Sequence, residues 1–118
     1  MARRRRSTDD DGALSALMLQ ILLVLSEGER HGYGMLQEIE QRSRAPFRLG
    51  PATLYRTLKR LLDARFIAEV ESGDDHAQRR RYRITDVGRR RAKLEATRLE
   101  GLVDWAHEVR VLGSETKG

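Results

Sequence analysis

Basic side chains recur along one segment of this sequence at a spacing that would place them together. A helix would carry Thr53, Arg56, Lys59 and Arg60 on one side, because they are separated by about one turn or less. Near the start of such a helix, an arginine such as Arg56 can donate two hydrogen bonds to guanine O6 and N7. Lys59 and Arg60 lie further along and are better placed for phosphate. This face predicts contact with DNA, and a solvated charged surface is the alternative.

A second group of basic residues is the run Arg79, Arg80 and Arg81. Guanidinium groups are attracted into a narrow minor groove, so an arm carrying this run could reach along DNA beside the first segment. Tyr33 and Tyr55 could place their hydroxyls on phosphates, although a tyrosine in an amphipathic helix is often a core ring with a wet tip. The two basic segments together favour DNA binding more strongly than either does alone.

The composition agrees with a polyanionic partner. The 118 residues include 23 Lys and Arg against 18 Asp and Glu, which gives a formal net charge of +5. The absence of cysteine excludes disulfides, thiolate catalysis and cysteine-bound zinc, and it indicates a reducing compartment, the cytoplasm with its nucleoid DNA. No ligand spacing relates His31, His76 and His107, and no nucleophile motif or phosphate-binding loop is present. We therefore expect no metal, no cofactor and no enzymatic activity.

Hydrophobic spacing predicts the helices that must position the first basic segment. Nearly every residue from 14 to 25 is apolar, which predicts a helix buried nearly all round and ended by Gly28. Tyr33, Leu36 and Ile39 recur at a spacing of three and predict a second, amphipathic helix. A third helix should begin at Gly50-Pro51, an acceptable N-cap followed by proline. Its apolar stripe lies opposite the basic residues and consists of Leu54, Leu58, Leu61 and Leu62.

The remaining elements are a hairpin and a long helix. Residues 66 to 71 and 79 to 85 alternate with a period of two and are joined by turn residues at 73 to 76, which predicts two antiparallel strands. Thr85 can cap a last helix that runs from Asp86 to about Leu112. The apolar stripe of that helix, with Trp105 beside it, consists of Leu99, Leu102, Ala106 and Val109.

These elements predict a mainly α fold with a small β-hairpin, of the α+β class. Three helices followed by a basic hairpin form a winged helix-turn-helix, which we assign to residues 13–85. Residues 1–12, with Arg3 to Arg6, should be a flexible basic arm, and residues 113–118 a flexible tail. We expect residues 86–112 to be a dimerisation helix, because small domains rarely leave such an apolar stripe bare. A stripe folded back onto the first helix is the alternative.

Five short motifs resemble the PadR-like transcriptional regulators of bacteria over roughly residues 14 to 94. The motifs are His31-Gly32-Tyr33, Phe47-Arg48-Leu49, Pro51-Ala52-Thr53-Leu54-Tyr55, Leu58-Lys59-Arg60-Leu61 and Arg79-Arg80-Arg81-Tyr82-Arg83-Ile84-Thr85 followed by Gly88. The resemblance implies a dimeric repressor of the smaller subfamily, in which a single helix after the hairpin pairs two subunits. Arg56 and Arg65 stand where that family often has proline and glycine, so the family's operator sequence is not carried over.

The resemblance also bears on Trp105. In some members of the family, aromatic residues of this helix line a cavity between subunits that accepts flat hydrophobic compounds, which makes Trp105 a candidate effector-binding residue. Packing against the partner subunit is the alternative. Our hypothesis is a homodimeric, sequence-specific repressor of a palindromic duplex operator, released by a small hydrophobic molecule or an ion. The competing hypothesis is a basic module that binds a protein or structured RNA without reading DNA sequence.

Overall fold

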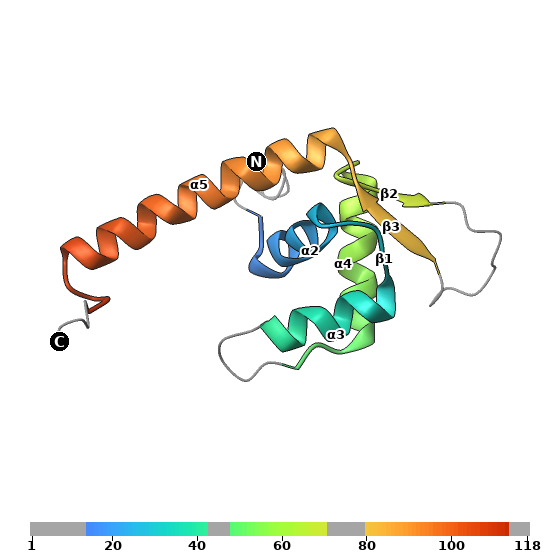
Figure 1. Cartoon of the computed structure of the whole chain (residues 1–118), viewed down its shortest axis with the longest axis horizontal. Coiled ribbons are helices and arrows are strands. Elements are labelled where there is room, and N and C mark those ends of the chain that lie inside the picture. The colour runs from blue at the N-terminus through green and yellow to red at the C-terminus, as the bar shows by residue number, and fades with distance from the viewer. Residues whose placement is uncertain (1–13, 43–47, 71–79, 114–118) are drawn as a thin grey trace, which may run out of the picture.

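A computed structural model describes residues 14–42, 48–70 and 80–113. The predicted arm (1–12) and nearly all of the predicted tail lie outside these ranges, as do the hairpin turn and Arg79. The elements, shown in Figure 1, are α2 (Ala16–Ser26), β1 (Arg30–His31), α3 (Gly32–Arg42), α4 (Pro51–Asp63), β2 (Ile67–Val70), β3 (Arg81–Ile84) and α5 (Asp86–Glu108). The predicted α+β class is confirmed. None of the described helices is long and apolar enough to span a membrane.

Helix α2 lies in the middle of the molecule, where it packs against α3, α4, β3 and α5 (Figure 1). Its near-continuous apolar sequence is explained by this position, since neighbours cover most of its circumference. The Oγ of Ser15 caps the helix by accepting from the Met18 N–H at 3.1 Å. Gly28 follows the helix with a φ of +146°, a conformation that favours glycine. The fully buried core side chains are Ile21, Leu22, Leu25, Met35, Ile39, Leu54, Leu58 and Leu61.

Helix α4 begins at the predicted residue and buries the predicted side. Gly50 is its N-cap and Pro51 its first residue, and three leucines of the predicted stripe are buried, while Leu62 is only partly covered. The helix ends in an unusual way, because Arg65 has a φ of +66°, where glycine is favoured. In this turn the Phe66 N–H donates to the Leu61 carbonyl at 3.0 Å, which satisfies a carbonyl at the helix end. The turn directs the chain from α4 into β2.

The sheet contains one strand more than the predicted hairpin. Strands β2 and β3 pair antiparallel, with Ile67 opposite Ile84 and Val70 opposite Arg81, so the predicted pairing is confirmed with slightly shorter strands. On the other side of β3 lies β1, which gives the order β1-β3-β2. A strand of only two residues has no alternation of its own, so the hydrophobic pattern does not reveal it. β1 fastens the start of α3 to the hairpin.

Helix α5 starts where predicted and ends earlier. Thr85 caps it by accepting from the Gly88 N–H at 3.0 Å. The expectation that the helix continues to Leu112 is wrong, because it ends at Glu108 and Val109 is its C-cap. Arg110 then has a φ of +66°, and the Val111 N–H turns back to the Ala106 carbonyl at 2.9 Å. This turn stops the helix even though apolar residues continue beyond it.

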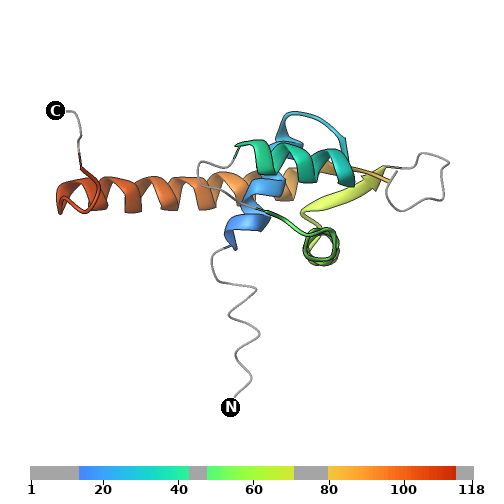
Figure 2. The ribbon, with the colours of Figure 1, turned by 90° about the horizontal axis from the view of Figure 1, so that it is seen from below.

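Within the described ranges, the buried residues of α5 all lie in its first half. Gly88, Ala92 and Glu95 are its buried residues, and they recur at the spacing of one helical face that meets α2. Beyond them the helix projects away from the winged part, as Figures 1 and 2 show from two directions. The apolar stripe of residues 99 to 106 therefore continues a face that is buried further back along the same helix.

Candidate nucleic-acid interface

The basic residues of α4 lie on the side of the helix that faces away from the core. Thr53, Arg56, Lys59 and Arg60 are all exposed, whereas Leu54, one position after Thr53, is fully buried. One Nη of Arg56 lies 3.4 Å from the Thr53 hydroxyl, so the two predicted base-contacting side chains are neighbours. Lys59 pairs loosely with Asp63, at 3.5 Å, on the last turn. The structure thus brings all four predicted residues of α4 onto one open surface.

The two tyrosines lie in different environments. Tyr33, in the first turn of α3, is 60% exposed, so its predicted place in the apolar stripe is wrong. Ile39 of that stripe is buried as predicted, and Met35 takes the place of Tyr33, because α3 turns that side toward α2 and α4. Tyr55 is partly buried, and its ring lies against Gly32, where an added Cβ would be 2.6 Å from the tyrosine hydroxyl. Tyr33 is therefore open to a partner, while Tyr55 packs between α4 and α3.

Two of the described hairpin arginines, Arg80 and Arg81, pair with carboxylates. The Nε of Arg80 lies 3.0 Å from an Oε of Glu69 on the neighbouring strand β2. One Nη of Arg81 lies 3.5 Å from an Oε of Glu29, in the turn before β1. Arg80 is exposed and Arg81 partly buried. Arg79, the third predicted member of this group, is outside the described residues.

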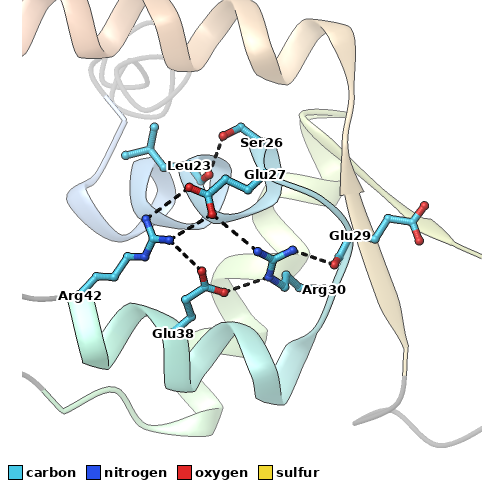
Figure 3. Close-up of polar contacts among 7 residues, drawn as sticks. All are labelled: Leu23, Ser26, Glu27, Glu29, Arg30, Glu38 and Arg42. Atoms are coloured by element: carbon cyan, nitrogen blue, oxygen red, sulfur yellow. Dashed lines mark hydrogen bonds and ion pairs between the residues drawn. The ribbon is translucent and has the colours of Figure 1, made fainter.

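A network of ion pairs joins the end of α2 to β1 and α3 (Figure 3). The Nε of Arg30 donates to Glu38 at 2.9 Å, and Arg42 lies 3.2 Å from Glu38 and 3.1 Å from Glu27. The hydrogen bond from Arg30 lowers the pKa of the Glu38 carboxyl, and the same bond raises the pKa of Arg30. Sequence reasoning missed this network, because its members are separated by up to 15 residues. It links α3 to the end of α2 and to β1.

A single carboxylate positions the chain as it enters α4. An Oε of Glu40, on α3, accepts from the backbone N–H of Leu49 at 2.7 Å. Leu49 is itself buried, so this segment is held by a hydrogen bond and by apolar packing one residue before the N-cap Gly50. Glu40 therefore helps to set where the exposed face of α4 begins, and the sequence pattern did not single it out.

A buried carboxylate joins the start of α2 to α5. Glu95 is 4% exposed, and one of its oxygens lies 2.6 Å from an Nη of Arg98. Its pKa is lowered by the hydrogen bond from Arg98 and, to a smaller extent, by one from the Leu14 backbone. Glu95 lies at the point where α5 leaves the winged part, so it fixes the direction of the projecting helix.

We expect acid to weaken the fold through these carboxylates. The pKa values of Glu38 and Glu95 are lowered in the folded chain, so protons bind the unfolded chain more readily. The stability that they contribute is complete above the ordinary carboxyl pKa of about 4.5 and is lost as the pH falls through the folded values. Urea unfolding between about pH 6 and pH 3 measures this loss. Glu95→Gln should make the decline shallower, and a decline as steep as in the wild type would contradict the assignment.

The predicted dimerisation residues are open to solvent in the single chain. The exposed fractions are 36% for Leu99, 42% for Leu102, 61% for Trp105 and 55% for Val109, while Ala106 is partly buried. The alternative in which this stripe folds back onto α2 is therefore wrong: only the preceding turns of α5 contact α2. A helix turns by about 100° per residue, so Trp105 lies to one side of the line through Leu99 and Ala106.

Among the described residues, no group of three or more His, Asp or Glu side chains is arranged to hold a metal ion.

Comparison with known proteins agrees with this architecture. The pattern of the "Transcriptional regulator PadR-like family" matches residues 21–94. The transcriptional regulator Rv3488 of Mycobacterium tuberculosis is 38% identical over 105 residues, which cover 88% of this chain and 92% of the relative. An uncharacterized protein of Lysinibacillus sphaericus is 36% identical over 80 residues, or 66% of this chain and 70% of its own.

Solved structures share the fold at lower sequence identity. A transcriptional regulator from Clostridium thermocellum superposes with a TM-score of 0.68 at 24% identity, over 78% of this chain and 87% of that one. Bacillus subtilis PadR, solved in complex with operator DNA, gives a TM-score of 0.57 at 24% identity, over 67% of this chain and 45% of that one. Because the matched segment is more than half of the chain and includes α4 and the hairpin, the protein belongs to the PadR-like family of transcriptional regulators, which are not enzymes.

Proposed function

We propose that the protein is a homodimeric repressor that binds a palindromic DNA operator, with α4 in the major groove. The observation that carries this proposal is the division of α4 into two faces. Its leucines are buried against α2 and α3, and its opposite side presents Thr53, Arg56, Lys59 and Arg60 to solvent. A recognition helix needs such a division, because one face must be anchored while the other approaches base edges.

The surroundings of α4 fit the backbone of the same duplex. Tyr33 is exposed at the start of α3, next to the helix end that attracts phosphate. Tyr55 presents a smaller part of its ring and hydroxyl, so we assign it a weaker phosphate contact. Arg80 and Arg81 lie on the hairpin beside α4, and we assign them, with Arg79, to the phosphates or the minor groove. The solved complex of Bacillus subtilis PadR with operator DNA supports this type of partner.

The projecting part of α5 supports the dimer. Leu99, Leu102 and Ala106 continue the line of residues that α5 buries against α2, yet Leu99 and Leu102 stay exposed in the single chain and Ala106 is only partly buried. Pairing two such helices about a two-fold axis would remove this apolar surface from water. It would also present two recognition helices to one face of DNA, about 34 to 36 Å apart when the half-sites are one turn apart. Val109, at the helix end, would lie at the margin of that contact.

We also assign to α5 the release of the repressor from DNA by an effector. Trp105 is the exposed aromatic residue of α5, and its place beside the stripe suits either the partner subunit or a flat hydrophobic compound at the subunit boundary. We keep the domain limits from the sequence as part of this proposal: a DNA-binding unit up to residue 85, followed by a helix that pairs two subunits.

The competing function is a basic module that binds structured RNA or protein without reading a DNA sequence. A specific regulator should prefer its operator to random duplex by about 10³ or more at physiological salt, whereas the basic module should not. Selection of duplexes from a random library would show this difference directly. Recovery of one palindromic sequence supports the repressor, and recovery of no common sequence supports the alternative.

Arg56→Ala tests the proposed reading face. We expect it to weaken operator binding by about 1 to 3 kcal/mol and to relax the preference at one base pair in each half-site, because a bidentate contact to a base is lost. Titration of operator variants with single base changes measures both effects. Arg80→Ala is the comparison variant and should weaken all sequences by a similar factor. If Arg56→Ala leaves the preference at every base pair unchanged, α4 does not read DNA with this residue.

A further inference from the structure

Arg80 and Arg81 of the hairpin differ from Arg56 of α4 in how they are paired. Arg80 and Arg81 each lie within ion-pair distance of a carboxylate, at 3.0 Å from Glu69 and 3.5 Å from Glu29. Arg56 has a hydroxyl neighbour, Thr53, and among the described residues no carboxylate lies within ion-pair distance of it. Two arginines assigned to the DNA backbone are thus already paired with negative charge when DNA is absent.

The pairing of β2 with β3 places Glu69 beside Arg80. Glu69 lies directly opposite Tyr82 in the register of β2 and β3, and Arg80 is two residues before Tyr82. Residues in this diagonal relation lie on the same face of an antiparallel pair, within reach of long side chains. Glu69 and Arg80 keep 40% and 49% of their side-chain surfaces exposed, so a phosphate can approach the same guanidinium. Any rotamer of Glu69 leaves its negative charge beside this part of the hairpin.

We propose that Glu69 weakens DNA binding by competing with DNA phosphates for Arg80, and that it thereby sets how tightly the hairpin holds any duplex. This inference rests on the proposed DNA-binding function. A phosphate that pairs with Arg80 must displace the Glu69 carboxylate, which then lies close to a polyanion. Like charges at that distance repel, and the displaced carboxylate must be neutralised by a cation from solution.

Two measurable properties follow from this competition. Removing the carboxylate should tighten binding to every sequence by the same factor, because a contact with the backbone carries no sequence information. It should also steepen the dependence of affinity on salt. In the wild type, Arg80 releases counterions from DNA when it binds a phosphate, while the displaced Glu69 takes up a cation. The net number of ions released per hairpin is therefore smaller, and so is the slope of log affinity against log salt.

The experiment compares wild type, Glu69→Gln and Glu100→Gln on the selected operator and on random duplex, each over a series of salt concentrations. Glu100→Gln removes the same charge from an exposed site on α5, about 20 Å or more along the helix from the hairpin. We expect Glu69→Gln to bind both duplexes about threefold to tenfold more tightly, the effect of two exposed ion pairs in a dimer. The slope of log affinity against log salt should steepen by about 1 to 2. Glu100→Gln should change affinity by less than about twofold.

A double-mutant cycle shows whether Glu69 acts through Arg80. In an Arg80→Ala background, Glu69→Gln should give a clearly smaller gain, because the two side chains no longer compete and only the weak repulsion between Glu69 and DNA is removed. A gain of the same size in that background would overturn the inference, as would unchanged or weaker binding by Glu69→Gln in a wild-type chain that binds DNA. If wild type and Glu69→Gln both fail to bind any duplex, the proposed function itself is wrong and the inference falls with it.

Discussion

Gly88→Ala is expected to lower the free energy of unfolding by about 3 kcal/mol. Among the described residues, this is the largest loss of stability that we expect from the addition of one methyl group. Gly88 is buried in the first turn of α5. A Cβ at this position would overlap the carbonyl oxygen of Phe66 and lie 3.0 Å from a side-chain carbon of Ile84. That carbonyl accepts hydrogen bonds from the Thr85 N–H and hydroxyl, so it cannot move without breaking the N-cap of α5. Urea denaturation measures the loss.

Gly34→Ala is the matched control. Gly34 is also in the first half of a helix, but no atom lies within 4 Å of the position that its Cβ would occupy. Alanine is favoured over glycine inside a helix, so this variant should gain about 0.5 to 1 kcal/mol. The two substitutions are chemically identical, and they should have opposite signs. A loss below about 1 kcal/mol for Gly88→Ala would mean that α5 is not anchored against the turn after α4.

If the protein is the dimer that we propose, Leu102→Glu is expected to convert it into monomers and to weaken operator binding by at least a hundredfold. Leu102 is 42% exposed in the single chain and lies on the stripe that we assign to the partner subunit. Each dimer would lose two buried leucines, at about 1.5 to 3 kcal/mol apiece, and would bury two carboxylates without partners. Sedimentation velocity at micromolar concentration measures the mass, and titration of the selected operator measures the affinity.

The control for Leu102→Glu is Thr97→Glu, which places the same charge on an exposed position of α5 that faces away from the stripe. It should remain a dimer and bind the operator nearly as well as wild type. The proposed dimer would be wrong if the wild-type chain sediments as a monomer and still binds a palindrome without cooperativity.

Local patterns were sufficient to predict the elements that carry the basic residues. Gly50 and Pro51 predict the start of α4, and its leucine spacing predicts which face is buried. Thr85 likewise predicts the start of α5. These features depend on residues within one or two turns of each other, where helix geometry alone relates sequence to direction. The exposed basic face of α4 could therefore be predicted without knowledge of the other elements.

The features that the sequence did not predict depend on residues far apart in the chain. Glu40 meets the Leu49 backbone, and Arg30 meets Glu38, only because α3 and its flanking segments fold together. The burial of Met35 in preference to Tyr33 depends on where α2 and α4 lie. Arg65 and Arg110 end helices in a backbone conformation that favours glycine, so a search for glycine misses both ends. Tertiary contacts decide each of these cases.

The short strand β1 also has a consequence for solubility. An uncovered strand edge exposes N–H and C=O groups that can pair with another molecule and start aggregation. By pairing with the side of β3 that β2 leaves free, β1 makes the first two residues of β3, Arg81 and Tyr82, internal to the sheet. The longer free edge within the described sheet that belongs to the hairpin is then β2, which is only four residues long and carries the charged Glu69. Shortness and charge are both features that discourage edge-to-edge association. The two residues of β1 therefore help to keep the basic hairpin from pairing with other molecules.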